Sequence, residues 1–121
     1  MHYMLMFFET TAEVERRNDP ERAPAYWGAW NAYVSDLQKS GVVVSGNGLQ
    51  PPHTATRVTL RAGKRHVQDG PLPDVKEHLG GYFVVDVRDL DAALELAARS
   101  PNVGAGHTEV RPVLPPPPQN G

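Results

Sequence analysis

The segment Asp69-Gly-Pro-Leu-Pro-Asp-Val-Lys-Glu-His-Leu-Gly-Gly-Tyr82 lies between two strand-like runs, and its turn residues decide how those runs are connected. Gly70 tolerates any φ, but its position before a proline biases it away from the α region, and Pro71 has no N–H to donate to a β-ladder. A tight turn is therefore predicted where the segment begins. Pro73 suits the first turn of a short helix over residues 75–78, which the following pair of glycines would end.

Strand-like runs flank this 69–82 segment on both sides. Residues 57–61 alternate between polar and apolar side chains, and Ala62-Gly63 would turn the chain into a partner strand at residues 64–68. On the other side, residues 82–87 are apolar at both parities of a strand. We therefore predict a half-exposed hairpin before the segment and a strand buried on both faces after it.

The chain begins with another strand of this two-faced kind, at residues 3–8. One of its faces can pack on helices, but the other needs a further layer. A chain with two credible helices can supply that layer only from a second copy of itself, so we predict a homodimer joined through sheet faces. Further strands are expected at residues 42–45 and 107–113, a break at 46–52, and a surface loop at 9–22.

Two helices are predicted. The first should begin near Pro24, which suits a first helical turn, and run to about Ser40. Apolar and aromatic side chains recur along it at helical spacing, at Trp27, Trp30, Val34 and Leu37. Such a stripe is typical of packing on a sheet, although both tryptophans could instead line a ligand cleft. Asp89 should cap the second helix, whose narrow apolar face would consist of Leu90, Ala93, Leu94, Ala97 and Ala98.

The predicted elements define an α+β fold. Without the hairpin their order is βαββαβ, which is the ferredoxin-like arrangement of an antiparallel sheet with both helices on one face, and the hairpin is an insertion. At 121 residues the chain fits one domain, which we assign to residues 1–113. Residues 114–121 include a run of prolines and too few apolar side chains to pack, so a disordered tail is expected.

Composition argues against several classes of function. The chain has no cysteine, which excludes disulfides and thiolate metal sites, and its five histidines are not spaced as metal ligands. A formal net charge of −2 gives no basic surface for nucleic acid. No apolar run reaches the roughly 18–20 residues of a membrane span, and the first strand lacks the flanks of a secretion signal, so a cytoplasmic location is expected. Because no nucleotide-binding loop is present, no cofactor is expected.

Several phrases of the sequence together resemble the YCII-related family, in the subgroup named for an Asp-Gly-Pro-Phe motif. They lie at residues 3–6, 46–52, 69–72, 76–82, 89–93 and 109–113, so the resemblance spans nearly the whole chain. Leu72 stands where the motif has phenylalanine. The resemblance implies a ferredoxin-like, dimeric α+β barrel. The His and Asp proposed as an acid–base pair in the wider family are not kept, because the corresponding stretches read Ala25-Tyr26-Trp27 and Arg99-Ser100-Pro101.

The candidate chemistry lies in the 69–82 segment. One hypothesis is that a small molecule binds in a cleft there and undergoes cofactor-free acid–base chemistry of the isomerase or lyase type, with Asp69 or His78 as the catalytic group. Asp69 could equally be an Asx-turn residue. The expected ligand-binding residues are His2, Trp27, Trp30, Gly70, Pro71, Lys76, Glu77 and Tyr82. The alternative is a non-catalytic dimeric binding or regulatory protein, since some members of the resembled subgroup occur beside extracytoplasmic-function sigma factors.

Overall fold

The computed structural model describes residues 1–71 and 74–116. Within these ranges the fold is mixed α+β, with an antiparallel sheet and three helices, and is compatible with the ferredoxin-like arrangement. The elements are β1 (His2–Thr10), α1 (Thr11–Asn18), α2 (Ala23–Lys39), β2 (Val43–Gly48), a single 3-10 turn (Pro52–Thr54), β3 (Thr56–Arg61), β4 (Lys64–Asp69), β5 (Glu77–Asp86), α3 (Leu90–Ala98) and β6 (His107–Pro112).

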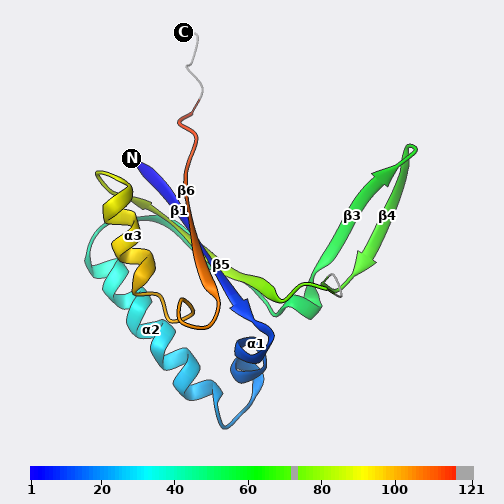
Figure 1. Cartoon of the computed structure of the whole chain (residues 1–121), viewed down its shortest axis with the longest axis horizontal. Coiled ribbons are helices and arrows are strands. Elements are labelled where there is room, and N and C mark those ends of the chain that lie inside the picture. The colour runs from blue at the N-terminus through cyan, green and yellow to red at the C-terminus, as the bar shows by residue number, and fades with distance from the viewer. Residues whose placement is uncertain (72–73, 117–121) are drawn as a thin grey trace.

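The main sheet has the strand order β2-β5-β1-β6 and is antiparallel throughout. Helices α2 and α3 cover one of its faces (Figure 1). Alternate residues of β1 point into this layer, because successive side chains of a strand lie on opposite faces. The core between the helices and the sheet contains Tyr3, Leu5, Phe7, Tyr33, Leu37, Val85, Ala93, Leu96 and Ala97.

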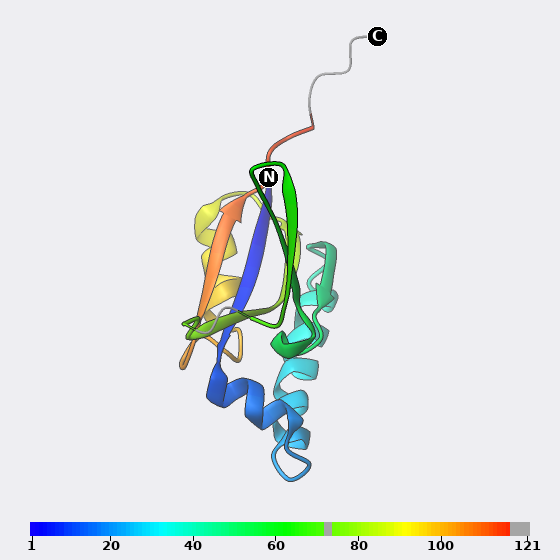
Figure 2. The same ribbon diagram turned by 90° about the vertical axis from the view of Figure 1, so that its right-hand side faces the viewer.

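The opposite face of the sheet carries no helix in the described part of the chain (Figure 1). Met4, Met6 and Phe8 of β1 lie on it and are half-buried, and Tyr82 and Val84 pair with two of them from β5. Strands β3 and β4 form a separate two-stranded sheet, which projects on this side, away from α2 and α3 (Figure 1). In Figure 2, where this side faces the viewer, the two strands lie in front of the main sheet.

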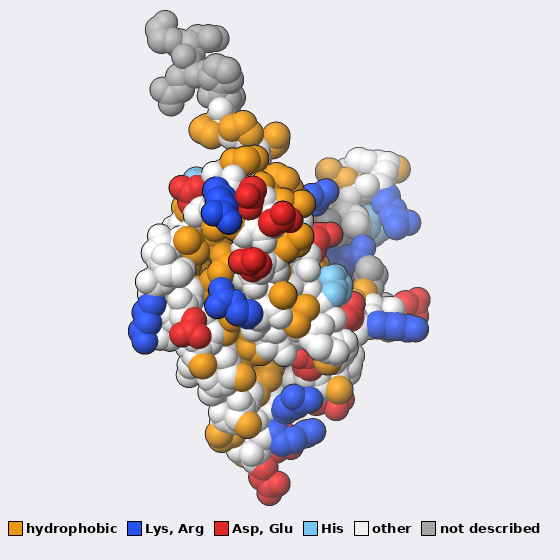
Figure 3. Space-filling model, turned by 60° about the vertical axis from the view of Figure 1, so that its left-hand side comes forward, with side chains coloured by type: hydrophobic (Ala, Val, Ile, Leu, Met, Phe, Trp, Pro, Cys, Tyr) orange, Lys and Arg blue, Asp and Glu red, His pale blue; other side chains and the backbone are white. Residues whose placement is uncertain are grey.

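The structure confirms the predicted helices near residues 23–40 and after Asp89. Helix α2 has a proline in its first turn, as expected, and the Asp89 side chain accepts a hydrogen bond from the Ala92 amide at 2.9 Å. The apolar face predicted for α3 is partly wrong. Leu90 and Leu94 are exposed, and Leu96 joins Ala93 and Ala97 in the core. The solvent side of the helical layer carries charged side chains of both signs among apolar ones (Figure 3).

The surface loop predicted for residues 9–22 is wrong, because this stretch contains the end of β1 and helix α1. A capping box begins the helix: the Thr10 hydroxyl accepts from the Glu13 amide, and the Glu13 carboxylate accepts from the Thr10 amide at 3.1 Å. This reciprocal pair satisfies two backbone N–H groups that the start of a helix would otherwise leave without partners. Thr10 and Glu13 have the spacing of this motif in the sequence.

The short helix predicted over residues 75–78 is also wrong, because β5 begins at Glu77 and continues through Gly80 and Gly81. These glycines do not end an element. Their missing side chains let neighbouring groups approach the backbone of β5. A Cβ on Gly80 would collide with the Glu9 carboxylate, and a Cβ on Gly81 would lie 2.9 Å from the Asn47 carbonyl oxygen. The break predicted at residues 46–52 likewise fails at its start, because β2 runs to Gly48. Leu72 and Pro73 lie outside the described residues.

The C-terminal residues that the structure describes continue from β6. The Val113 amide donates to the His2 carbonyl at 2.9 Å, and Leu114 is exposed. Residues 117–121 of the predicted tail lie outside the described residues. No helix of the described chain is both long enough and apolar enough to cross a membrane.

Candidate functional site

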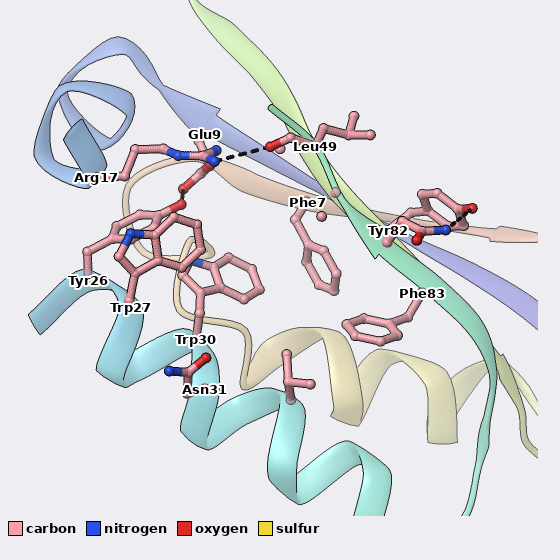
Figure 4. Close-up of a pocket in the computed structure, with 15 residues that line it drawn as sticks. Phe7, Glu9, Arg17, Tyr26, Trp27, Trp30, Asn31, Leu49, Tyr82 and Phe83 are labelled. Atoms are coloured by element: carbon pink, nitrogen blue, oxygen red, sulfur yellow. Dashed lines mark hydrogen bonds and ion pairs between the residues drawn. The ribbon is translucent and has the colours of Figure 1, made fainter. Parts of the chain in front are cut away.

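A cleft of about 140 Å³ opens where the first half of α2 faces the end of β1 and the edge formed by β2 and β5 (Figure 4). Most of its wall is aromatic or glycine backbone, and three polar side chains gather at one end. The lining residues are Phe7, Glu9, Arg17, Tyr26, Trp27, Trp30, Asn31, Val34, Asn47, Gly48, Leu49, Gly80, Gly81, Tyr82 and Phe83.

Glu9 is the acidic group of the cleft. It continues the inward-facing series of β1, and its side chain is 2% exposed. The hydroxyl of Tyr26, which projects from the first turns of α2, donates a hydrogen bond to Glu9 Oε2. Gly80 faces the other carboxylate oxygen, where a larger residue would not fit. Strand, helix and glycine thus fix one orientation of the carboxyl group.

Arg17 of α1 supplies the positive charge. Its Nη1 lies 3.7 Å from Glu9 Oε1, its Nη2 donates to the Leu49 carbonyl at 3.1 Å, and its guanidinium carbon lies 5.0 Å from the centre of the Trp27 ring. The side chain is only 9% exposed. Its Nε is buried and has no hydrogen-bond partner among the described residues. Arg17 therefore makes one hydrogen bond, to the Leu49 carbonyl, and among the described residues neither Nε nor Nη1 has an acceptor.

Burial raises the pKa of the Glu9 carboxyl above its ordinary value, because the ionised form loses its water. The hydrogen bond from Tyr26 and the charge of Arg17 oppose this rise, whereas the nearby Glu13 carboxylate adds to it. Burial and the Glu9 carboxylate together raise the pKa of the Tyr26 hydroxyl, so it remains a hydrogen-bond donor across the physiological range. Such a buried acid can take up and release a proton closer to neutrality than an exposed glutamate.

The apolar walls consist of aromatic rings that meet edge to face. Phe7 packs against Trp30 with ring centres 5.1 Å apart and against Phe83 at 6.1 Å, while Trp27 meets Tyr26 at 4.9 Å. These rings give the cleft a largely apolar wall. Trp27 is 42% exposed, so it forms the outer rim of the cleft.

Similarity to known proteins covers nearly the whole chain. A model of the YCII-related domain matches residues 1–116. The chain belongs to the YCII-related family. A stretch of 67 residues is 41% identical to an uncharacterised protein of Rhizobium meliloti (strain 1021), and it covers 54% of this chain and 54% of that protein. The chain thus matches about half the length of this curated relative. The Asp-Gly-Pro-Phe subgroup stays a prediction.

Three of the residues predicted from the sequence line the cleft of this YCII-related protein. Trp27 and Trp30 come from α2, and Tyr82 comes from β5, where its hydroxyl accepts a hydrogen bond from the Asn47 side chain at 3.1 Å. Asp69, Gly70 and Pro71 lie at or beyond the end of β4 and are not among the lining residues. The Thr56 hydroxyl approaches the Asp69 carboxylate at 3.5 Å, and the Gly70 amide donates to the Ala55 carbonyl at 2.7 Å.

The other predicted residues lie on β1, on β5 or just before it. His78 pairs with Glu9 in the register of the β1–β5 ladder. The Glu77 carboxylate lies 2.7 Å from Nδ1 of His107, whose ring stacks on Phe8. Two further residues lie away from the cleft: Lys76, and His2, whose Nε2 lies 3.8 Å from the Asp86 carboxylate. Nothing in the described residues groups three His, Asp or Glu side chains as metal ligands.

Glu9, Arg17 and Tyr26 were not predicted from the sequence as site residues. Two signals could have found them. The inward parity of β1, with Tyr3, Leu5 and Phe7 buried, extends to residue 9 and places a carboxyl group on the core face. The capping box at Thr10 would then have placed Arg17 on a helix that starts beside that carboxyl group.

Proposed function

We propose that this YCII-related protein binds a small planar molecule in the cleft and that Glu9 exchanges a proton with it, without a cofactor. One observation carries the proposal: Glu9 is a buried carboxyl group with a raised pKa that lines an apolar cleft and is oriented by Tyr26. Perturbed acids in apolar pockets are typical of sites of proton transfer.

In the proposed step, the ionised Glu9 carboxylate removes a proton from a carbon next to a carbonyl group of the ligand. The electron pair left on that carbon delocalises onto the carbonyl oxygen. Glu9 then returns the proton to another atom of the same molecule, which makes the reaction an isomerisation. Atoms and electrons balance between the protein and the ligand, so no oxidant or reductant is required. A carboxylate with a raised pKa is the stronger base for this step.

The ligand position that we propose brings in residues predicted from the sequence. Trp27 and Trp30 line the cleft and would contact the ligand. Tyr82 is also a lining residue, but its side chain lies on the uncovered face beside Met6, so its contact with the ligand stays a prediction. His78 pairs with Glu9 across the β1–β5 ladder but is not among the residues that line the cleft, so its role in proton transfer stays a prediction. The catalytic role of Asp69 stays a prediction. The Asp69→Asn variant tests it, because asparagine keeps the hydrogen bonds of an Asx turn but cannot act as an acid.

We further propose that the uncovered sheet face packs against the same face of a second copy, giving a dimeric α+β barrel. Met4, Met6 and Phe8 support this proposal, because they form an apolar row on a face that no described helix covers. Burying such side chains stabilises by roughly 1.5–3 kcal/mol each.

The test is a screen followed by an exchange measurement. Small aromatic and carbonyl compounds are screened by the shift that they cause in thermal unfolding, and each compound that binds is incubated in deuterium oxide and followed by proton NMR. The proposal predicts loss of a carbon-bound proton signal with the wild type, and at least a hundredfold slower loss with Glu9→Gln, since general-base catalysis contributes about 10²–10⁴-fold. Binding without exchange would contradict the catalytic proposal and indicate the non-catalytic binding or regulatory alternative.

A further inference from the structure

We propose that the cleft is selective for single-ring planar anions whose carboxylate accepts a hydrogen bond from Arg17. This inference rests on the proposed function and specifies the ligand that Glu9 would act on. It follows from the volume of the cleft, from the unused donor of Arg17 and from the charges around them.

The volume of the cleft corresponds to about one ring. The cleft measures about 140 Å³. An apolar cavity of about 150 Å³ in a protein interior holds one benzene molecule. The ring of Phe7, which meets those of Trp30 and Phe83 at interplanar angles of 72°, forms part of the apolar wall that such a ring would contact.

The unused donor indicates an acceptor on the ligand. A buried N–H without a partner is costly, and native proteins rarely leave one unpaired. Arg17 Nε is such a group among the described residues, and Arg17 lines the cleft. Nη2 donates to the Leu49 carbonyl, whereas Nη1 lies 3.7 Å from Glu9 Oε1 and makes no hydrogen bond. A ligand oxygen would supply an acceptor for Nη1, and for the covered Nε after a small shift of the side chain.

Arg17 is the group that would hold an anion at this end of the cleft. Two acids lie close by, Glu9 and Glu13. The Glu13 carboxylate is occupied by the cap of α1, where it accepts from the Thr10 amide at 3.1 Å. Glu9 accepts from Tyr26, and its Oε1 lies 3.7 Å from Arg17, which is beyond hydrogen-bond distance. Arg17 Nη1 therefore has no hydrogen-bond acceptor among the described residues, and a ligand carboxylate would supply one while Glu9 stays beside it.

The experiment compares two single-ring probes that differ in charge, benzoate and benzyl alcohol. The chain contains two tryptophans and both line the cleft, so tryptophan fluorescence reports on it directly. At pH 7 benzoate is expected to bind at least about tenfold more tightly than benzyl alcohol, because hydrogen bonds to charged groups are the stronger class. Arg17→Gln is expected to remove this preference, so that the two probes bind with similar affinity.

Arg16→Gln is the matched control, because it makes the same charge change on an exposed residue of the same helix and should retain the preference for benzoate. If Arg17→Gln does not fold, Arg17→Lys is used instead. Lysine keeps the positive charge but lacks the planar guanidinium, so a reduced preference for benzoate over benzyl alcohol is expected. The comparison of the two probes on the wild type needs no variant. Equal or tighter binding of benzyl alcohol would overturn the anion inference and leave the small-molecule function intact. Binding of neither probe at millimolar concentration would overturn both.

Discussion

The Tyr26 hydroxyl donates a hydrogen bond to the Glu9 carboxylate and thereby joins the start of α2 to the end of β1 inside the cleft. Both side chains are buried, at 8% and 2% exposure. The acid therefore has a fixed orientation and a raised pKa at the same time, because the contacts that hold it also exclude water.

Tyr26→Phe should destabilise the protein by about 1–3 kcal/mol, because it leaves a buried carboxyl oxygen without its donor. It should also raise the pKa of Glu9 further, because the hydrogen bond from Tyr26 stabilises the ionised carboxylate and the variant lacks it. Urea unfolding measures the first effect. Tyr33→Phe is the control: it removes a buried hydroxyl that donates to the Leu96 carbonyl at 2.8 Å, so it should cost stability without changing the titration of Glu9.

Glu9→Gln should remove the part of the pH dependence of the unfolding free energy that comes from the Glu9 carboxyl group. Because the folded-state pKa of Glu9 is raised above its ordinary value of 4.5, its contribution is fully present below that value and is lost as pH rises toward the folded pKa. The difference in unfolding free energy, wild type minus variant, should therefore fall as pH rises above 4.5.

The same comparison controls for the other acids of the chain. The lowered pKa values of Asp19 and Asp86 affect the wild type and Glu9→Gln equally, so their contributions cancel in the difference. Urea unfolding of both proteins across the pH range measures that difference. A difference that stays constant with pH would show that burial does not perturb Glu9.

Gly80→Ala should displace the Glu9 carboxyl group, because the added methyl group would collide with Oε1. We expect a loss of about 1–3 kcal/mol, as in other overpacked sites, together with loss of ligand binding. Gly104→Ala adds the same methyl group where no atom lies within 4 Å, so it should change stability by less than about 0.5 kcal/mol. Equal effects of the two substitutions, measured by urea unfolding, would contradict the role given to Gly80.

Met6→Glu should convert the proposed dimer to a monomer in sedimentation, because it places a charge in the middle of the uncovered sheet face. Leu94→Glu makes the same kind of change on an exposed position of α3 and should leave the dimer intact. A wild-type protein that sediments as a monomer at micromolar concentration would contradict the dimer itself.

Local patterns predicted much of the fold. The two-faced strands at residues 3–8 and 82–87, the proline at the start of α2 and the cap at Asp89 each determine an element through neighbouring residues alone. The error at the start of β5 arose where distant residues decide the structure, whereas the error at residues 9–22 missed a local capping signal. Gly80 and Gly81 have the sequence pattern of a helix end, yet they lie inside β5 because Glu9 and Asn47 approach them from other strands.

The site was harder to predict than the fold. Trp27 and Trp30 were recognisable because their spacing on one helix is regular. Glu9, Arg17 and Tyr26 come from three elements, and only the packing of α1 and α2 against β1 brings them together. The interpretation of residues 9–22 as a loop removed the helix that carries Arg17, and with it the reason to connect the three.

The most direct test is the pKa of Glu9 itself, measured by carbon-13 NMR on protein labelled at its glutamate carboxyl groups. The Glu9 resonance is assigned by its absence in Glu9→Gln. The account predicts that this resonance titrates above 4.5, because burial disfavours its ionised form, and that Tyr26→Phe moves the midpoint to still higher pH. A Glu9 carboxyl that titrates at or below 4.5 would contradict the proposal that this group is the proton-transfer acid of the cleft.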